Sequence, residues 1–393
     1  MLEQVMQVAL STPLTDPNSE KCMWGLPLLL WGDPGIGKSA RIKRMATLAH
    51  AYAAIIFPSG RLPEDFAGTP VQDGKGGLVT VSTLQQVKEL CVIGEGIIYF
   101  DEINTARPMT QSALLGVILD RRMGDLLFPG GVRVVAAAND PKTNAGANEL
   151  SLPLANRFVH YSMSSPAASE WGDFMFGVNQ PGDQGSLVVM EQNVKAEWSH
   201  SWAHAVSQVV GFIRATPGAL HKMPKEGDDI RAYPTPRTWD WAARALATSK
   251  ALKMHDAVTY QLLQGCVGLG AADEFTEYML KADLPSPVEV LKNGFTPDGR
   301  MDRSYAVYTA LATYVASMEQ GAARKAAAIR TWEIFEKAIE ARVVDLLFSA
   351  VSIMIEAGLS SMADKEIAMA SARVTPRFDQ KLQKKLRGAY GKP

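Results

Sequence analysis

Cysteine is scarce in this sequence, and no long apolar run is present. Three cysteines, Cys22, Cys91 and Cys266, lie far apart and form no CxxC pair. An odd number of widely spaced cysteines excludes a disulfide framework and a cysteine-based zinc site, and it is typical of a reducing compartment. The longest apolar run, residues 346–355, is shorter than the ~20 residues that cross a bilayer. The N-terminus has no signal-peptide pattern, so we expect a soluble, cytoplasmic chain without a membrane span.

Net charge is also nearly absent. Lys and Arg number 40 and Asp and Glu number 41, which gives a formal net charge of −1. Such a balance argues against wholesale electrostatic binding to nucleic acid or to an anionic membrane. The last 23 residues nevertheless form a basic tail, which is either a solvated segment or a contact for an acidic partner. Its basic residues are Arg373, Arg377, Lys381, Lys384, Lys385, Arg387 and Lys392.

The composition is that of a packed protein with more than one domain. A length of 393 residues predicts two or three domains, and 47% hydrophobic with 21% charged residues excludes global disorder. The first half alternates short apolar runs with helical patterns, such as residues 40–54 and 109–122. Continuous apolar runs of this length are typical of strands covered by helices on both faces. The five runs are residues 26–31, 53–57, 96–100, 132–138 and 158–163.

Two glycine-rich interruptions predict hairpins beside this sheet. Residues 71–82 contain Asp-Gly and Gly-Gly pairs between strand-like ends, and residues 124–136 place Pro129-Gly130-Gly131 between two apolar runs. A minimal nucleotide-binding fold requires neither hairpin. We therefore interpret both as appended elements.

The second half is predicted to be mostly helical. Residues 164–190 have the Gly, Ser, Asp and Pro content of a connecting segment. Helical patterns follow at residues 196–214, 238–253, 256–269, 302–318 and 322–358. The predicted parts are an α/β domain with two hairpin inserts at 1–165, a connecting segment with a helix at 166–235, a helical lid at 236–320 and a helical region with the basic tail at 321–393.

One motif predicts a phosphate site. Gly32-Asp33-Pro34-Gly35-Ile36-Gly37-Lys38-Ser39 matches GxxxxGK[ST] between an apolar strand and a helical stretch, which is the setting of a P-loop. The glycines let successive backbone N–H groups turn toward one anion, and the helix N-terminus favours negative charge. All eight residues are therefore predicted to bind ATP, with Lys38 on the β- and γ-phosphates and Ser39 as a ligand of Mg²⁺.

Polar residues follow the third and fourth predicted strands of the sheet. Asp101 and Glu102 follow residues 96–100, which we expect to form a strand neighbouring the P-loop strand. There Asp101 can hold the Mg²⁺ shell, and Glu102 can polarise a water for attack on the γ-phosphorus. Asn139 directly follows residues 132–138. Its amide can orient that water or contact the γ-phosphate; alternatively, it only caps the strand. The sequence therefore predicts a P-loop NTPase with a parallel five-stranded sheet, followed by helices.

The order of these signals resembles AAA+ ATPases of the MoxR type, close to the dynein-related AAA family. Residues 101–115 (DEINTARPMTQSALL) are similar to that group's DEINRAPPKTQSALL signature. Residues 118–139 resemble members thought to work beside a von Willebrand A-domain protein. The resemblance covers about residues 25–240. Thr105 replaces the group's usual Arg, and Ala136-Ala137-Ala138 replaces its commoner Ala-Thr-Gln run.

The resemblance implies further site residues. Gly32 to Ser39 correspond to Walker A, and Asp101 and Glu102 to Walker B. Asn139 then corresponds to sensor 1 and Arg237 to sensor 2, a nucleotide-contacting arginine. Arg157 corresponds to the arginine finger that reaches a neighbouring subunit's γ-phosphate, although Asn156 replaces the frequent Asp before it. Arg121 and Arg122 are the alternatives for that trans arginine.

The resemblance also implies a function. The leading hypothesis is an ATP-hydrolysing ring, a hexamer of this chain, that remodels a client protein or inserts a metal or cofactor into it, with a von Willebrand A-domain partner. In that group the two predicted hairpins engage the client. A nucleic-acid motor or loader is the second hypothesis, although no DNA-binding module is recognisable after residue 240. A nucleotide-gated scaffold with little turnover is the third.

Overall fold

The chain folds into two compact units. The first comprises Met1–Ala196 and His221–Ala272, and the second comprises Glu197–Leu220 and Asp273–Pro393. The predicted boundaries at residues 165, 235 and 320 do not coincide with this division. The computed structural model describes residues 1–48, 51–72, 78–81, 84–141, 148–166, 187–225, 231–360 and 364–378. Most of the basic tail lies outside these residues.

The first unit is built on a five-stranded parallel sheet with the order β2-β5-β8-β1-β9. Its strands are β1 (Leu28–Trp31), β2 (Tyr52–Ile56), β5 (Glu95–Phe100), β8 (Gly131–Ala138) and β9 (Val159–Ser162). They coincide with the five predicted runs to within two residues at each end. Every residue of β1 is buried, as expected for a parallel strand with helices on both faces. The predicted fold class, a parallel sheet with flanking helices and a helical C-terminal region, is confirmed.

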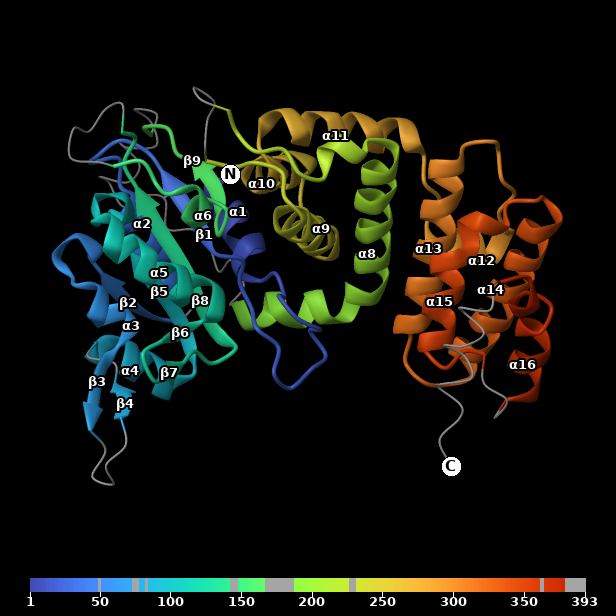
Figure 1. Cartoon of the computed structure of the whole chain (residues 1–393), viewed down its shortest axis with the longest axis horizontal. Coiled ribbons are helices and arrows are strands. Elements are labelled where there is room, and N and C mark those ends of the chain that lie inside the picture. The colour runs from blue at the N-terminus through green and yellow to red at the C-terminus, as the bar shows by residue number, and fades with distance from the viewer. Residues whose placement is uncertain are drawn as a thin grey trace. The chain divides into compact units, whose positions relative to one another are not determined.

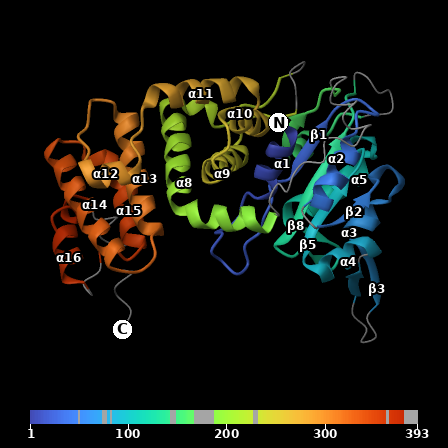
Figure 2. The same cartoon turned by 180° about the vertical axis from the view of Figure 1, so that it is seen from behind.

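Helices cover both faces of this sheet (Figure 1 and Figure 2). Alternate side chains of a strand point to opposite faces. On β5, Ile98 and Phe100 join a buried cluster with residues of α4 and α5, whereas the hydroxyl of Tyr99 lies beside Ser39 of α2. Helix α2 therefore lies on one face of the sheet, and α4 and α5 lie on the other.

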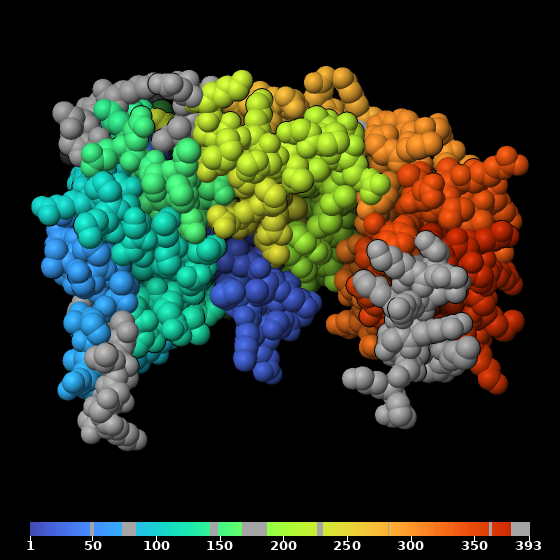
Figure 3. Space-filling model, viewed as in Figure 1, coloured from blue at the N-terminus to red at the C-terminus, as the bar shows by residue number. Residues whose placement is uncertain are grey.

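The helices of the first unit include four that the sequence patterns did not predict, α1, α3, α4 and α6. The helix predicted at residues 40–54 ends earlier because β2 begins at Tyr52. The helices are α1 (Leu2–Leu10), α2 (Lys38–Leu48), α3 (Pro63–Ala67), α4 (Gln85–Ile93), α5 (Pro108–Asp120), α6 (Leu152–Ala155), α9 (Pro236–Ala251) and α10 (Asp256–Val267). Figure 3 shows the loop that follows α1, in dark blue, at the surface of this unit.

One predicted hairpin is confirmed and the other is displaced. Strand β3 (Thr69–Gln72) pairs antiparallel with β4 (Leu78–Val81), while the glycine-rich residues 73–77 lie outside the described part of the chain. The second hairpin joins β6 (Arg122–Met123) to β7 (Leu126–Leu127) rather than turning at Pro129-Gly130-Gly131.

Packing explains why the glycine pair does not form that turn. The N–H of Trp24 donates to the carbonyl of Gly130 at 2.9 Å. A Cβ on Gly130 would lie 2.0 Å from the carbonyl oxygen of Cys22. Gly130 is therefore required for close backbone contact with residues 22–24, and the left-handed Gly124 makes the turn instead.

The second unit is helical in its described residues. It contains parts of α8 (Leu187–Ala215) and α11 (Leu269–Ala282), followed by α12 (Pro287–Asn293), α13 (Met301–Ser317), α14 (Ala322–Glu340), α15 (Phe348–Glu356) and α16 (Lys365–Ser371). Tyr308, Trp332 and Phe335 are fully buried at its core.

The single helix predicted at residues 322–358 is interrupted. Arg342 adopts a left-handed conformation with φ of 61°, and the N–H of Val343 donates to the carbonyl of Ala338. This is the geometry of a helix C-terminus, so α14 ends and α15 begins separately. None of the described helices combines the length and apolar character that a bilayer crossing needs.

Candidate nucleotide-binding site

The P-loop joins the carboxyl end of β1 to the first residue of α2, Lys38. Gly35 and Gly37 have φ values of +83° and +91°, which side chains other than glycine rarely adopt. A Cβ at either position would meet nothing within 4 Å, so these positions need glycine for its backbone freedom rather than for space. Asp33 and Pro34 are exposed, and Ile36 is half-buried against Gly32. The loop is therefore folded as the motif predicted.

The ammonium group of Lys38 lies among three oxygen atoms. Its Nζ donates to the carbonyls of Gly32 at 2.7 Å and Asp33 at 3.0 Å, and to Oδ1 of Asn139 at 2.8 Å. Burial lowers the pKa of Lys38, while the carboxylates of Asp101, Glu102 and Asp33 act in the opposite direction. The cation is thus held between the P-loop and the end of β8.

Asn139 is fixed by a second asparagine, Asn104. Asn104 accepts from the N–H of Asn139 at 3.2 Å and donates its Nδ2 to the carbonyl of Asn139 at 2.8 Å. The Nδ2 of Asn139 is buried and has no hydrogen-bond partner among the described residues. Asn139 therefore presents an unmet donor beside Lys38, which suits a phosphate oxygen or a water. The sequence patterns assigned no role to Asn104.

The side chains of Ser39, in α2, and Asp101, at the end of β5, are in direct contact. Ser39 donates its hydroxyl to Oδ2 of Asp101 at 2.6 Å. The expectation that β5 neighbours the P-loop strand is wrong, because β8 lies between β1 and β5. The contact forms nevertheless because α2 packs against β5 and carries Ser39 over to the end of that strand.

Tyr99 completes this network. Its hydroxyl donates to Oδ1 of Asp101 at 2.8 Å and lies 3.2 Å from the hydroxyl of Ser39. Burial raises the pKa of Tyr99, so the phenol keeps its proton near neutral pH. Sequence patterns missed this residue because a tyrosine in an apolar strand looks like core packing.

Glu102 differs from Asp101 in exposure and backbone. Its side chain is exposed, and its φ of 50° lies in the left-handed region, which is uncommon for a residue other than glycine. Its N–H donates to Oδ1 of Asp101 at 3.0 Å. Strained conformations of this kind cluster at functional sites. The arrangement leaves the carboxylate of Glu102 open to a water at the sheet edge.

The donors at this edge fit Mg²⁺. Ser39 and Asp101 supply a hydroxyl and a carboxylate oxygen that already lie at contact distance. No cluster of three or more His, Cys, Asp or Glu side chains occurs within the described residues. Mg²⁺ is usually held by one or two protein oxygens together with substrate phosphates and waters, so a complete protein cage is not required.

Comparison with known proteins agrees with this geometry. Residues 27–158 match the AAA domain of the dynein-related subfamily. The match spans about one third of the chain and includes every P-loop, β5 and β8 residue described above. No curated protein matches the chain.

One solved structure with similarity to the chain is that of a candidate ATPase from Cytophaga hutchinsonii. The two share 14% identity, with 72% of this chain and 88% of that chain covered, and the TM-score is 0.44. No residue assignment follows from a likeness at this level.

Arg157, close to the end of the matched residues 27–158, lies at the opposite edge of the sheet from the P-loop. It precedes β9, whose first residue, Val159, is level with Leu28 of the parallel strand β1. At ~3.3 Å per strand residue, about 15–20 Å separate this amino edge from the P-loop. Arg157 is thus too distant to contact phosphates bound by the P-loop of its own chain.

Arg237 lies beside Arg157. Its Nη1 lies 3.4 Å from Oδ1 of Asn156, which also accepts from the hydroxyl of Thr235 at 3.2 Å. Burial and, second, the charge of Arg237 lower the pKa of Arg157, whereas Asp120 acts against this shift. The structure therefore groups the two predicted arginines with each other and not with the P-loop.

The arginine pair also has unmet hydrogen-bonding groups. Nη1 of Arg157 donates to the carbonyl of Pro153 at 2.7 Å, but its Nε is buried without a partner among the described residues. Nδ2 of Asn156 is also buried without a partner among the described residues. Two guanidinium groups and an unpaired amide are suited to an anion.

Arg121, one alternative for the trans arginine, is buried. Its guanidinium donates to the carbonyls of Val132 and Gly25 of the same chain. Burial and the nearby Arg133 lower the pKa of Arg121 to about 10, which leaves it charged at neutral pH. These contacts occupy Arg121 within the fold. Arg122, the other alternative, is exposed.

Arg231 is a residue at the P-loop edge that no local pattern indicated. Its Nη2 pairs with Asp140 at 2.7 Å, and its guanidinium lies 4.6 Å from the ring centre of Trp31. Both partners adjoin site residues, because Trp31 precedes Gly32 and Asp140 follows Asn139. Only the fold reveals this proximity, since Arg231 is remote from both partners in the sequence.

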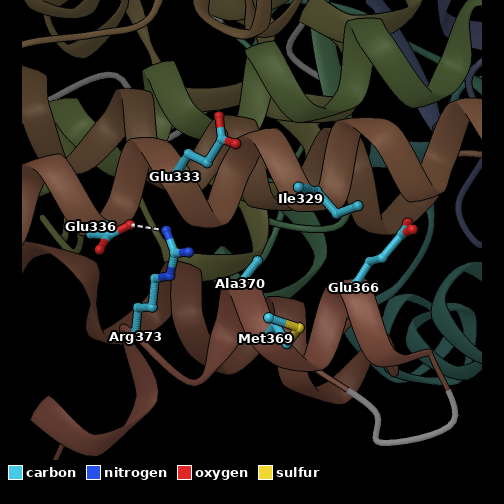
Figure 4. A pocket seen from close by; sticks show the side chains of 7 residues that line it. All are labelled: Ile329, Glu333, Glu336, Glu366, Met369, Ala370 and Arg373. Carbon is cyan, nitrogen blue, oxygen red and sulfur yellow. Dashed lines mark hydrogen bonds and ion pairs between the residues drawn. The ribbon is translucent and has the colours of Figure 1, made fainter.

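A surface hollow between α14 and α16 in the second unit is less suited to a ligand (Figure 4). Its three acidic residues each already pair with a cation of the same unit. The pairs are Glu333 with Arg330, Glu336 with Arg373 and Glu366 with Lys325. This hollow therefore offers no excess of charge to a ligand.

Proposed function

We propose that this chain is an ATPase that uses Mg²⁺ and acts as a ring of identical subunits. The observation that carries the proposal is the convergence of Lys38, Asn139, Ser39 and Asp101 at one sheet edge. Lys38 pairs with Asn139, whose Nδ2 has no partner among the described residues, and the hydroxyl of Ser39 pairs with the carboxylate of Asp101. That is the division a metal–triphosphate complex requires.

The roles of the side chains follow from their positions. The P-loop N–H groups and Lys38 bind the β- and γ-phosphates, and Mg²⁺, when bound to Ser39 and Asp101, neutralises their charge. Glu102 accepts a proton from a water while the oxygen of that water attacks the γ-phosphorus. The bond between the γ-phosphorus and the β–γ bridging oxygen then breaks, which gives ADP and phosphate. Nδ2 of Asn139 orients the water or the γ-phosphate.

The amino edge supports assembly. Arg157 and Arg237 are remote from the P-loop of their own chain, yet they form a cationic pair, in which Nε of Arg157 is buried without a partner among the described residues. We therefore assign both to the γ-phosphate bound by a neighbouring subunit. A trans arginine contributes ~10³–10⁵ in rate, so hydrolysis is expected to depend on assembly.

The output of the ring is the remodelling of a client protein. This part of the proposal rests on the similarity of residues 101–115 and 118–139 to MoxR-type proteins and on the two hairpins beside the sheet. A hexamer and a von Willebrand A-domain partner belong to the same hypothesis. A pulldown from native extract with the Glu102→Gln protein in ATP, compared with ADP, identifies the client.

Substitution of Glu102 by Gln tests the ATPase proposal. The amide keeps the shape but accepts no proton, so turnover is expected to fall by about 10²–10⁴-fold while ATP still binds. Phosphate release and equilibrium nucleotide binding are the two measurements. Glu95→Gln is the matched control, because Glu95 is exposed at the opposite end of the same strand.

Two results would contradict the proposal. Unchanged turnover in the Glu102→Gln protein would remove Glu102 as the base. Negligible turnover in the wild-type protein and all variants, with ATP bound normally, would favour a nucleotide-gated scaffold.

A further inference from the structure

The two carboxylate oxygens of Asp101 have different surroundings. Oδ1 accepts two hydrogen bonds, from the hydroxyl of Tyr99 at 2.8 Å and from the N–H of Glu102 at 3.0 Å. Oδ2 accepts one hydrogen bond, from the hydroxyl of Ser39 at 2.6 Å. One oxygen is thus anchored by its own strand end, while the other faces the P-loop helix. The carboxylate is held in one orientation.

Tyr99 is well placed to maintain this orientation. Its side chain is fully buried in β5 and faces α2, so the ring has little freedom to move. A buried donor to a carboxylate forms a charge-assisted bond, which is stronger than a neutral one. The backbone N–H of Glu102 alone fixes one point of the carboxylate, and two donors fix its plane.

The different surroundings of the two oxygens affect which metal ion Asp101 can bind. Mg²⁺ demands octahedral geometry and takes carboxylates through one oxygen, whereas Ca²⁺ accepts bidentate carboxylates and irregular geometry. With Oδ1 occupied by two donors, Asp101 offers a single oxygen. The site is thereby shaped for the smaller ion.

We propose that Tyr99 is a positioning residue that restricts Asp101 to one-oxygen coordination and so makes the nucleotide site selective for Mg²⁺ over Ca²⁺. This inference rests on the proposed function, because the metal is the one that accompanies ATP. The general pattern is that partners of a metal ligand, which do not touch the metal, change its affinity by ~10–100-fold when removed.

The test is Tyr99→Phe, which removes one oxygen atom and keeps the ring. Binding of a fluorescent ADP analogue to the full-length chain is measured in EDTA, in Mg²⁺ and in Ca²⁺. The expected result is unchanged affinity in EDTA, because the phosphate contacts of the P-loop remain. The gain in affinity produced by Mg²⁺ should fall by about tenfold, and the gain produced by Ca²⁺ should fall less.

Two further variants separate this role from a general loss of packing. Tyr308→Phe is the matched control, since Tyr308 is also fully buried and its hydroxyl has no partner among the described residues. It should leave all three affinities unchanged. In an Asp101→Asn background, Tyr99→Phe should have little additional effect on the Mg²⁺ gain, because the two residues act through one group.

The outcomes are distinct. An unchanged Mg²⁺ gain in Tyr99→Phe overturns the inference, as does an equal loss of the Mg²⁺ and Ca²⁺ gains, or a loss of affinity already present in EDTA. Additive effects in the double variant also overturn it. If the wild-type chain binds no nucleotide, the proposed function fails together with this inference. If Mg²⁺ raises the affinity of the wild-type chain and raises that of Tyr99→Phe equally, this inference alone is wrong.

Discussion

The two edges of the sheet differ in how their charged groups are satisfied. At the carboxyl edge, Lys38 has three oxygen acceptors, and both oxygens of Asp101 are hydrogen-bonded within the same chain. At the amino edge, Arg157 and Arg237 lie together, and buried donors of Arg157 and Asn156 have no partner among the described residues. The first edge is organised by its own chain, whereas the second has groups suited to a ligand supplied by another.

This contrast is informative because both edges belong to the same strands. A P-loop site can be assembled by one chain, since its residues follow strands β1, β5 and β8 on the same side. Two neighbouring guanidinium groups repel each other, and an anion bound beside them would offset that repulsion. The difference therefore indicates where a neighbour's phosphate would contribute most.

The largest expected effect comes from Arg157→Ala. Turnover should fall about 10³-fold while ATP binding and folding persist, because the lost guanidinium acts on a neighbour's γ-phosphate. Mixing this variant with Glu102→Gln subunits should restore part of the activity, since one protein keeps the base and the other keeps the arginine. Steady-state phosphate release on the mixture is the measurement. Absence of rescue would remove the trans role from Arg157.

Arg237→Ala sharpens the comparison, with an expected loss on the order of 10²-fold. Because Arg237 lies beside Arg157, the same mixing with Glu102→Gln should restore activity. A residue that contacts its own chain's nucleotide would give no rescue, because the only subunits with a base would lack the arginine. The mixing assay therefore decides between the neighbour's nucleotide and its own.

Arg121→Met should affect stability rather than catalysis. It leaves the carbonyls of Val132 and Gly25 without their donor, and we expect a loss of about 2–4 kcal/mol in the free energy of unfolding. Denaturant unfolding measures this loss, and Arg122→Met is the exposed control, with an expected change below about 0.5 kcal/mol. A full-stability Arg121→Met protein whose activity is rescued by mixing would restore Arg121 as the trans arginine.

Local patterns were sufficient for the sheet and for the phosphate site. A GxxxxGK[ST] motif between a strand and a helix has few alternative conformations, because its glycines and its helix start are set by neighbouring residues. The apolar runs likewise predicted all five strands, since parallel strands buried on both faces lack polar alternation. Patterns were weaker for the turn at residues 129–131, where Gly130 is needed for contact with Cys22 and not for a hairpin.

By itself, then, the sequence determined the five strands, the P-loop and the acidic end of β5, because each depends on residues close together along the chain. Only the tertiary structure decided which of these side chains meet. The contacts of Ser39 with Asp101, Lys38 with Asn139 and Arg237 with Asn156 join residues 62, 101 and 81 positions apart. Strand order and helix packing set such contacts, and they placed Tyr99 on Asp101, Asn104 on Asn139 and Arg237 beside Arg157.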